Sequence, residues 1–196
     1  MRRTRCARLL EALAFAAIIG GCASHPVEHF YTVSDLNLQA GADATPARAN
    51  GRTVVVAEAS LPELINRPQM VMRASGHEIS ILENHRWAEP LASDLTRALI
   101  AALRQADAGA DFVSSEGPRA QDGAQVLEVE IGELVSGPGP EVSLQASWVL
   151  RDRSRASVGQ GQLTTKIPCA AGPEAVVAAY AQAMRALADA IAASLH

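Results

Sequence analysis

The sequence has 196 residues, of which 48% are hydrophobic, and its formal net charge is −4 at pH 7. This length and composition predict one globular domain with a substantial core. The acidic balance argues against a nucleic-acid-binding protein, which would carry a basic stripe, and against broad adhesion to anionic lipid headgroups.

The N-terminus has the three-part layout of a bacterial export signal. Four arginines precede an apolar run over residues 9–19, which is too short to span a bilayer stably because spanning takes about 20 residues. The run ends in Ile-Gly-Gly-Cys at residues 19–22, which resembles the lipobox of bacterial lipoproteins. We expect cleavage of residues 1–21 and acylation of Cys22. The alternatives are an ordinary secretory signal and an uncleaved anchor helix.

Cleavage and acylation define the predicted domains and location. Loss of residues 1–21 removes a net charge of +3 and leaves the mature chain at −7. Residues 22–28 would form a lipidated tether, and residues 29–196 a single domain. No Asp follows Cys22, and in similar lipoproteins such an Asp usually causes retention in the inner membrane. The signal therefore predicts anchoring to the periplasmic face of the outer membrane, held by two or three acyl chains.

Short strands dominate the first part of the predicted domain. Residues 29–33 are rich in aromatic and β-branched side chains. Residues 52–59 contain three consecutive valines, which favours a central strand buried on both faces. Residues 69–74 and 77–82 predict a hairpin that turns at Ser75-Gly76.

The first long helix is predicted over residues 88–105, after a break at residues 84–86. Trp87 and the leucines that follow it recur at near-helical spacing. Pro90 would lie in the first turn, where its missing N–H costs little.

Three alternating segments and a helix complete the chain. Residues 127–131, 142–150 and 160–167 predict an antiparallel meander with one solvated face, preceded by a short strand at residues 112–113. A final helix is predicted from Pro173 onward. Its apolar stripe consists of Val176, Tyr180, Met184, Leu187, Ile191 and Leu195. The predicted fold class is α+β, with an antiparallel or mixed sheet and two main helices packed on one face.

No catalytic or metal-binding motif stands out from its structural context. The five histidines are not paired at metal-ligand spacing, and no serine lies in a Gly-x-Ser-x-Gly turn. After processing, Cys169 is the single free thiol, and a structural role is favoured because no base lies near it in sequence. Glu128 and Glu130 alternate with apolar residues, as on a solvated strand face. We therefore expect no metal, no cofactor and no enzymatic activity.

Two stretches are unusual and suit a partner surface. Residues 61–69 form a loop with two prolines and several apolar residues, and residues 86–91 place Arg and Trp at a helix entry, two residue types enriched in binding hot spots. The candidate partner-binding residues are Leu61, Pro62, Arg67, Pro68, Gln69, Arg86, Trp87, Glu89 and Pro90. The alternative is that Trp87 fills the core and that Arg67 or Arg86 pairs locally with Glu89.

These stretches resemble the PqiC-type family of transport auxiliary lipoproteins. The matching segments are the aromatic strand at residues 30–33, the valines at 54–56, Leu61-Pro62, Arg67-Pro68-Gln69, Arg73 and the Trp-Ala-Glu-Pro-Leu segment at 87–91. The match runs in order through the mature chain and is strongest from Val54 to Leu103. Residues 64–66 are Leu-Ile-Asn where the family often has Tyr, Leu and Asp, which weakens any expectation of a specific Tyr or Asp contact.

The resemblance implies a non-enzymatic role in intermembrane lipid transport. Its implied partners are an MCE-type periplasm-spanning protein and inner-membrane components, often an ABC transporter, and the role is compatible with self-assembly of the lipoprotein around its partner. A stand-alone lipoprotein that binds a hydrophobic ligand is the alternative. An envelope hydrolase is the third hypothesis, and it would require convergent polar groups near Cys169 or His77.

Overall fold

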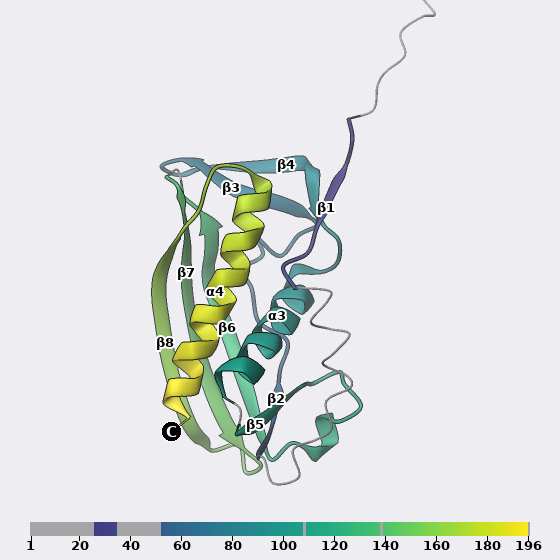
Figure 1. Ribbon diagram of the computed structural model, residues 1–196, viewed down its shortest axis with the longest axis vertical. Coiled ribbons are helices and arrows are strands. Elements are labelled where there is room, and N and C mark those ends of the chain that lie inside the picture. The colour runs from purple at the N-terminus through teal and green to yellow at the C-terminus, as the bar shows by residue number, and fades with distance from the viewer. Residues whose placement is uncertain (1–25, 35–51, 108, 138, 196) are drawn as a thin grey trace, which may run out of the picture.

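The computed structural model describes residues 26–34, 52–107, 109–137 and 139–195 (Figure 1). The predicted signal and Cys22 lie outside these ranges. In chain order the elements are β1 (His29–Tyr31), β2 (Arg52–Val56), β3 (Gln69–Ser75), β4 (Glu78–Trp87), α3 (Leu91–Ala106), β5 (Ala110–Ser114), the 3-10 helix η1 (Ala120–Asp122), β6 (Gln125–Ser136), β7 (Glu141–Asp152), β8 (Ser157–Pro168) and α4 (Pro173–Ser194).

The eight strands form one mixed sheet organised around β6. One edge of β6 pairs with β7, which pairs with β8, and these three strands form an antiparallel meander. The other edge of β6 pairs in parallel with β2 at one end and with β3 at the other. Strand β5 extends the sheet beyond β2, and β4 and then β1 extend it beyond β3.

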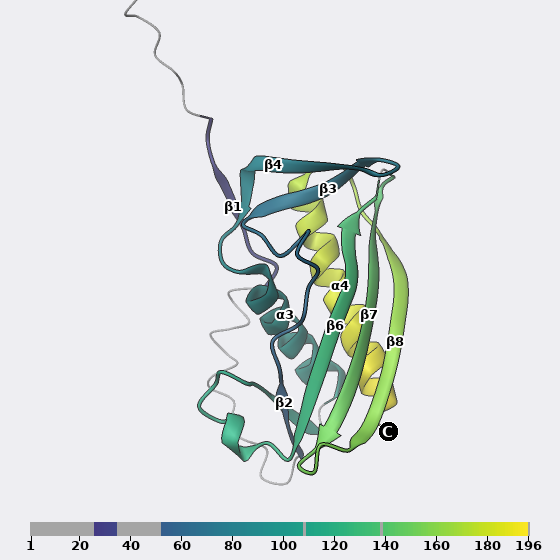
Figure 2. The same cartoon turned by 180° about the vertical axis from the view of Figure 1, so that it is seen from behind.

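Both helices cover the same face of this sheet (Figures 1 and 2). The predicted α+β class, with a mixed sheet and two main helices on one face, is confirmed. Strand β1 and the β3–β4 hairpin lie at one end of the molecule, and the C-terminal end of α4 lies at the opposite end.

The core forms where the apolar positions of the strands and helices face one another. In β6, Leu127, Val129 and Ile131 are buried, whereas Glu128 and Glu130 are exposed, because successive strand residues point to opposite faces. The valines of β2 are buried in the interior of the sheet between β5 and β6, as predicted.

Helix α4 uses its apolar stripe to cover the meander. Five of the predicted stripe residues are buried, namely Val176, Tyr180, Met184, Leu187 and Ile191, and Leu195 packs against the core just after the helix ends. Among the described helices, α4 alone is long and apolar enough to cross a membrane. Half of its most apolar segment is buried within the domain, which is the pattern of a core helix.

The junction between β4 and α3 differs from the sequence-based prediction. The break predicted at residues 84–86 is wrong, because β4 continues to Trp87 and its last residues pair in parallel with β1. The helix begins at Leu91 rather than at residue 88, and Pro90 is its N-cap in an extended conformation (φ −53°, ψ 124°). A proline disfavours helical geometry in the residue before it, which keeps Glu89 out of the helix.

Candidate functional site

The loop between β2 and β3 is folded back on itself and fixed to the core by one side chain. The carbonyl of Pro62 accepts hydrogen bonds from the N–H groups of Ile65 (3.1 Å) and Asn66 (3.0 Å). Ile65 is 4% exposed and belongs to the core, whereas its neighbour Leu64 is 47% exposed. The turn therefore presents Leu64 to solvent from a firmly held backbone.

Trp87 joins this loop to the core. Its backbone N–H donates to the carbonyl of Pro68 at 2.8 Å, and its indole ring stacks on the ring of Tyr180 with 5.6 Å between centroids. The Tyr180 hydroxyl donates to the carbonyl of Leu134 at 2.9 Å, and burial raises the pKa of this phenol. Since Trp87 is only 5% exposed, the expectation that it fills the core is confirmed.

The two unusual stretches of the sequence meet at one pocket. Its volume is about 380 Å³, and its lining residues are Asn66, Arg67, Pro68, Trp87, Glu89, Pro90 and Leu91. Sequence reasoning selected both stretches but did not name Asn66 and Leu91 among the candidate partner-binding residues. The hydrogen bond from the backbone N–H of Trp87 to the carbonyl of Pro68 joins the two stretches. In the chain, the β3–β4 hairpin separates them.

The remaining candidate residues are placed around the pocket without lining it. Leu61 packs against the core, and Pro62 accepts the two hydrogen bonds of the turn. Gln69 donates across the hairpin to Glu83 (Nε2 to Oε2, 3.3 Å). Arg86 forms an ion pair with Glu28 (Nε to Oε1, 3.5 Å) and donates to the carbonyl of Glu83.

The two charged residues that line the pocket, Glu89 and Arg67, differ in whether their side chains have partners. Glu89 forms an ion pair with Arg97 of α3, so the expectation that it pairs with Arg67 or Arg86 is wrong. The buried Nε of Arg67 has no hydrogen-bond partner among the described residues. The pocket thus contains a carboxylate with a cationic partner and a guanidinium with an unsatisfied donor.

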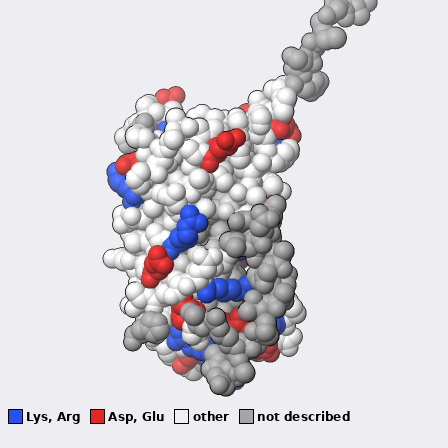
Figure 3. All heavy atoms as spheres, viewed as in Figure 1, with Lys and Arg blue, Asp and Glu red and all other residues white. Residues whose placement is uncertain are grey.

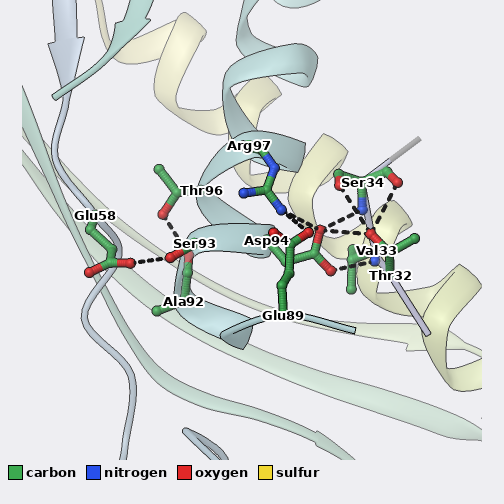
Figure 4. A network of polar contacts seen from close by, with 10 residues as sticks. All are labelled: Thr32, Val33, Ser34, Glu58, Glu89, Ala92, Ser93, Asp94, Thr96 and Arg97. Atoms are coloured by element: carbon green, nitrogen blue, oxygen red, sulfur yellow. Dashed lines mark hydrogen bonds and ion pairs between the residues drawn. The ribbon is translucent and has the colours of Figure 1, made fainter. Parts of the chain in front are cut away.

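Asp94 fixes the segment after β1 to the first turn of α3 (Figure 4). This carboxylate is fully buried and accepts hydrogen bonds from the N–H groups of Val33 (2.6 Å) and Ser34 (3.0 Å) and from the hydroxyl of Thr32 (3.0 Å). Arg97 also contacts it, with 3.5 Å between Nη2 and Oδ1. A chain of polar contacts therefore leads from the N-terminal segment through Asp94 and Arg97 to Glu89 in the pocket.

Sequence reasoning attached no role to Asp94. An acidic residue in the first turn of a helix is common because it faces the positive end of the helix dipole. That position was visible in the sequence, but the partners of Asp94 lie about 60 residues earlier and no local pattern points to them.

The groups considered for catalysis are dispersed. Cys169 is partly buried, its Sγ donates to the carbonyl of Ala170 at 2.9 Å, and burial raises the pKa of the thiol. His77 is exposed in the turn between β3 and β4. Within the described ranges, no three His, Cys, Asp or Glu side chains are close enough to hold a metal ion. On the helix-bearing face, charged side chains are interspersed with wide uncharged areas (Figure 3).

Solved structures share this fold. The chain is similar to an uncharacterized protein of known crystal structure, with 18% identity and a TM-score of 0.71 over 87% of this chain and 100% of that one. It is also similar to protein XCC0632 from Xanthomonas campestris, with 18% identity and a TM-score of 0.58 over 74% of this chain and 86% of that one. At these identities the likeness concerns the fold alone.

Family membership comes from the sequence. No curated protein matches it significantly. The family model described as "ABC-type transport auxiliary lipoprotein component" matches residues 35–192, which is most of the chain. The resemblance to PqiC-type lipoproteins is thereby confirmed, and a lipoprotein of this kind is located in the cell envelope. The chain belongs to the family of ABC-type transport auxiliary lipoproteins.

Proposed function

We propose that this protein is a non-enzymatic auxiliary component of an intermembrane lipid transport system. It is anchored through acylated Cys22 to the periplasmic face of the outer membrane. Its partners are an MCE-type periplasm-spanning protein and an inner-membrane ABC transporter. The observation that carries this proposal is the pocket that unites the loop around Arg67 with the entry of α3. Family membership supports the link to a transport system.

The pocket suits docking because rigid elements hold its walls. Trp87 ends a strand and stacks in the core, and Pro68 and Pro90 each fix their own backbone torsion. Little conformational entropy is lost when such a surface binds a partner. A non-enzymatic role is supported by the groups available there, since the lining carboxylate of Glu89 is held by Arg97.

The proposal is tested by site-specific photocrosslinking in intact cells. A photoreactive amino acid replaces Asn66 or Pro90, both exposed lining residues, in the full-length precursor. The same amino acid at Val158, which is 50% exposed on β8, is the matched control. We expect the pocket positions, and not Val158, to crosslink to the MCE-type protein.

Two outcomes would contradict this function. Crosslinks of equal yield from Val158 and the pocket would mean that contact with the transport partner is nonspecific. Absence of any transport component from the pocket crosslinks, with lipid released from the purified monomer in native mass spectrometry, would favour the stand-alone ligand-binding lipoprotein.

A further inference from the structure

Arg67 is the one basic side chain that lines the pocket within the described part of the chain. Its Nε is buried without a hydrogen-bond partner. A buried donor that is left unsatisfied costs free energy, so an occupant that supplied an acceptor to this group would be stabilised there. Arg67 as a residue is only partly buried and lines the pocket, so an occupant would lie against it.

The other pocket groups favour an anionic occupant with an apolar neighbour. Pro68, Trp87 and Pro90 supply apolar walls. Glu89 is paired with Arg97, so this carboxylate already has a cationic partner before anything binds. Helix α3 starts at this pocket, where Pro90 and Leu91 belong to the lining.

We propose that the pocket binds a carboxylate of the transport partner, carried by or adjacent to an apolar or aromatic residue, and that Arg67 is the residue that recognises it. This inference rests on the proposed docking function and specifies the chemistry of the docked segment. A guanidinium and a carboxylate form two parallel hydrogen bonds, which gives orientation as well as affinity.

A protein carboxylate fits this pocket better than a lipid phosphate. Phosphate sites usually combine several donors or cations, whereas Arg67 is the single basic residue among the described residues of the lining. The mature chain, with an expected net charge of −7, would also be repelled by an anionic bilayer surface.

The test is a titration of the mature lipoprotein, with its acyl chains, in detergent micelles. The probe is N-acetyl-phenylalanine, and N-acetyl-phenylalaninamide is the neutral control with the same ring. The readouts are the NMR signals of the Arg67 Nε–H and of the two tryptophan indoles. Trp148 donates its indole N–H to Ser194 at the far end of α4, so its signal is an internal control.

We expect saturable shifts of the Arg67 and Trp87 signals with the acid, an affinity for the amide weaker by about tenfold or more, and an unmoved Trp148 signal. Arg67→Gln should abolish the preference for the acid over the amide. Arg67→Lys should retain a weakened preference, because the charge remains but the planar fork is lost. Arg185→Gln, which removes an exposed arginine of α4 that does not line the pocket, should behave as the unmodified protein.

Equal affinity for the acid and the amide would overturn the inference, and so would an undiminished preference in a folded Arg67→Gln variant. Shifts of the Arg67 signal in nanodiscs containing phosphatidylglycerol, with none from N-acetyl-phenylalanine, would assign the site to membrane phosphate and overturn it as well. The crosslinking experiment fails or succeeds independently. Pocket crosslinks to the MCE-type protein without carboxylate binding would refute only the recognition chemistry.

Discussion

Gly161 lies on β8 where the strand passes closest to Trp148. A Cβ at this position would lie 2.3 Å from Cζ2 and 2.7 Å from Cε2 of the indole. The indole is buried and held by its hydrogen bond to Ser194, so it has little room to move away. A side chain at residue 161 would therefore overpack the contact between the meander and α4.

Gly161→Ala should lower the free energy of unfolding by about 1–3 kcal/mol, the usual cost of forcing an extra methyl group into a packed core. Equilibrium denaturation measures the change. Gly159→Ala is the matched control on the same face of the same strand, because its added methyl would meet Leu150 at an ordinary 3.6 Å. Equal stability of the two variants would show that the indole yields more easily than its packing indicates.

Tyr180 makes stability depend on pH at the alkaline end. Burial, and secondarily the charge of Cys169, raise the pKa of the phenol above its ordinary value of about 10. The folded state therefore keeps its proton where the unfolded state loses it. The contribution of Tyr180 to stability is complete below pH 10 and declines as pH rises above it, by up to about 1.4 kcal/mol per pH unit.

Tyr180→Phe should reduce this alkaline slope and cost about 1–3 kcal/mol at neutral pH, because the buried carbonyl of Leu134 loses its donor. Urea midpoints between pH 8 and pH 11 provide the comparison. The two proteins differ only at residue 180, so the difference between their slopes isolates the phenol. An unchanged slope in the variant would exclude Tyr180 as its source.

At the scale of elements, the segment after β1 and the helix α3 are joined through Asp94. Asp94→Ala should destabilise the protein by at least about 2 kcal/mol, because the N–H groups of Val33 and Ser34 lose a buried acceptor. Hydrogen exchange at these two amides should accelerate more than exchange in the β6–β7 ladder. Asp189→Ala, on the exposed side of α4, is the control and should leave both amides protected. Unaltered protection in Asp94→Ala would mean that β1 pairing alone holds the segment.

The periodic pattern of apolar residues predicted the strands and the helix whose side chains alternate regularly between core and solvent. Strands β6 and β7 alternate between core and solvent, and α4 carries one stripe, so periodicity alone identified them. Residues 84–86 were wrongly expected to be a break because Asn, His and Arg have no strong strand preference. His85 and Arg86 pair with His29 and Phe30, 56 residues earlier, and this pairing holds them in the strand.

The stretches that form the candidate site could be predicted from the sequence, but the residues that line the pocket could not. Proline, arginine and tryptophan drew attention to both stretches, but only the fold shows that Arg67 and Pro90 line one pocket and that Arg86 does not. The core role of Trp87 was a stated alternative because tryptophan is usually buried. The roles of Asp94 and Arg97 depend on segments distant in sequence, so no spacing pattern revealed them.

At the scale of the whole molecule, the lipobox predicts where the domain is held. Ala23→Asp should move the protein from the outer to the inner membrane, because an Asp directly after the acylated cysteine usually causes retention there. Density-gradient fractionation of membranes measures the distribution. Ala23→Asn has nearly the same size without the charge and is the control for an effect on signal processing. Inner-membrane location of the unmodified protein would contradict the predicted sorting.

The position of β1 also determines how the domain bears force. Cys22 precedes His29 by seven residues, and β1 lies at an edge of the sheet, parallel to the last residues of β4. Tension between a membrane anchor and a bound transport partner would enter the domain along β1. The first contacts to carry it would be the β1–β4 hydrogen bonds and the bonds to Asp94, loaded together. Because β4 continues to Trp87, this tension would pass through the strand that lines the pocket before it reached the hydrophobic core under the meander.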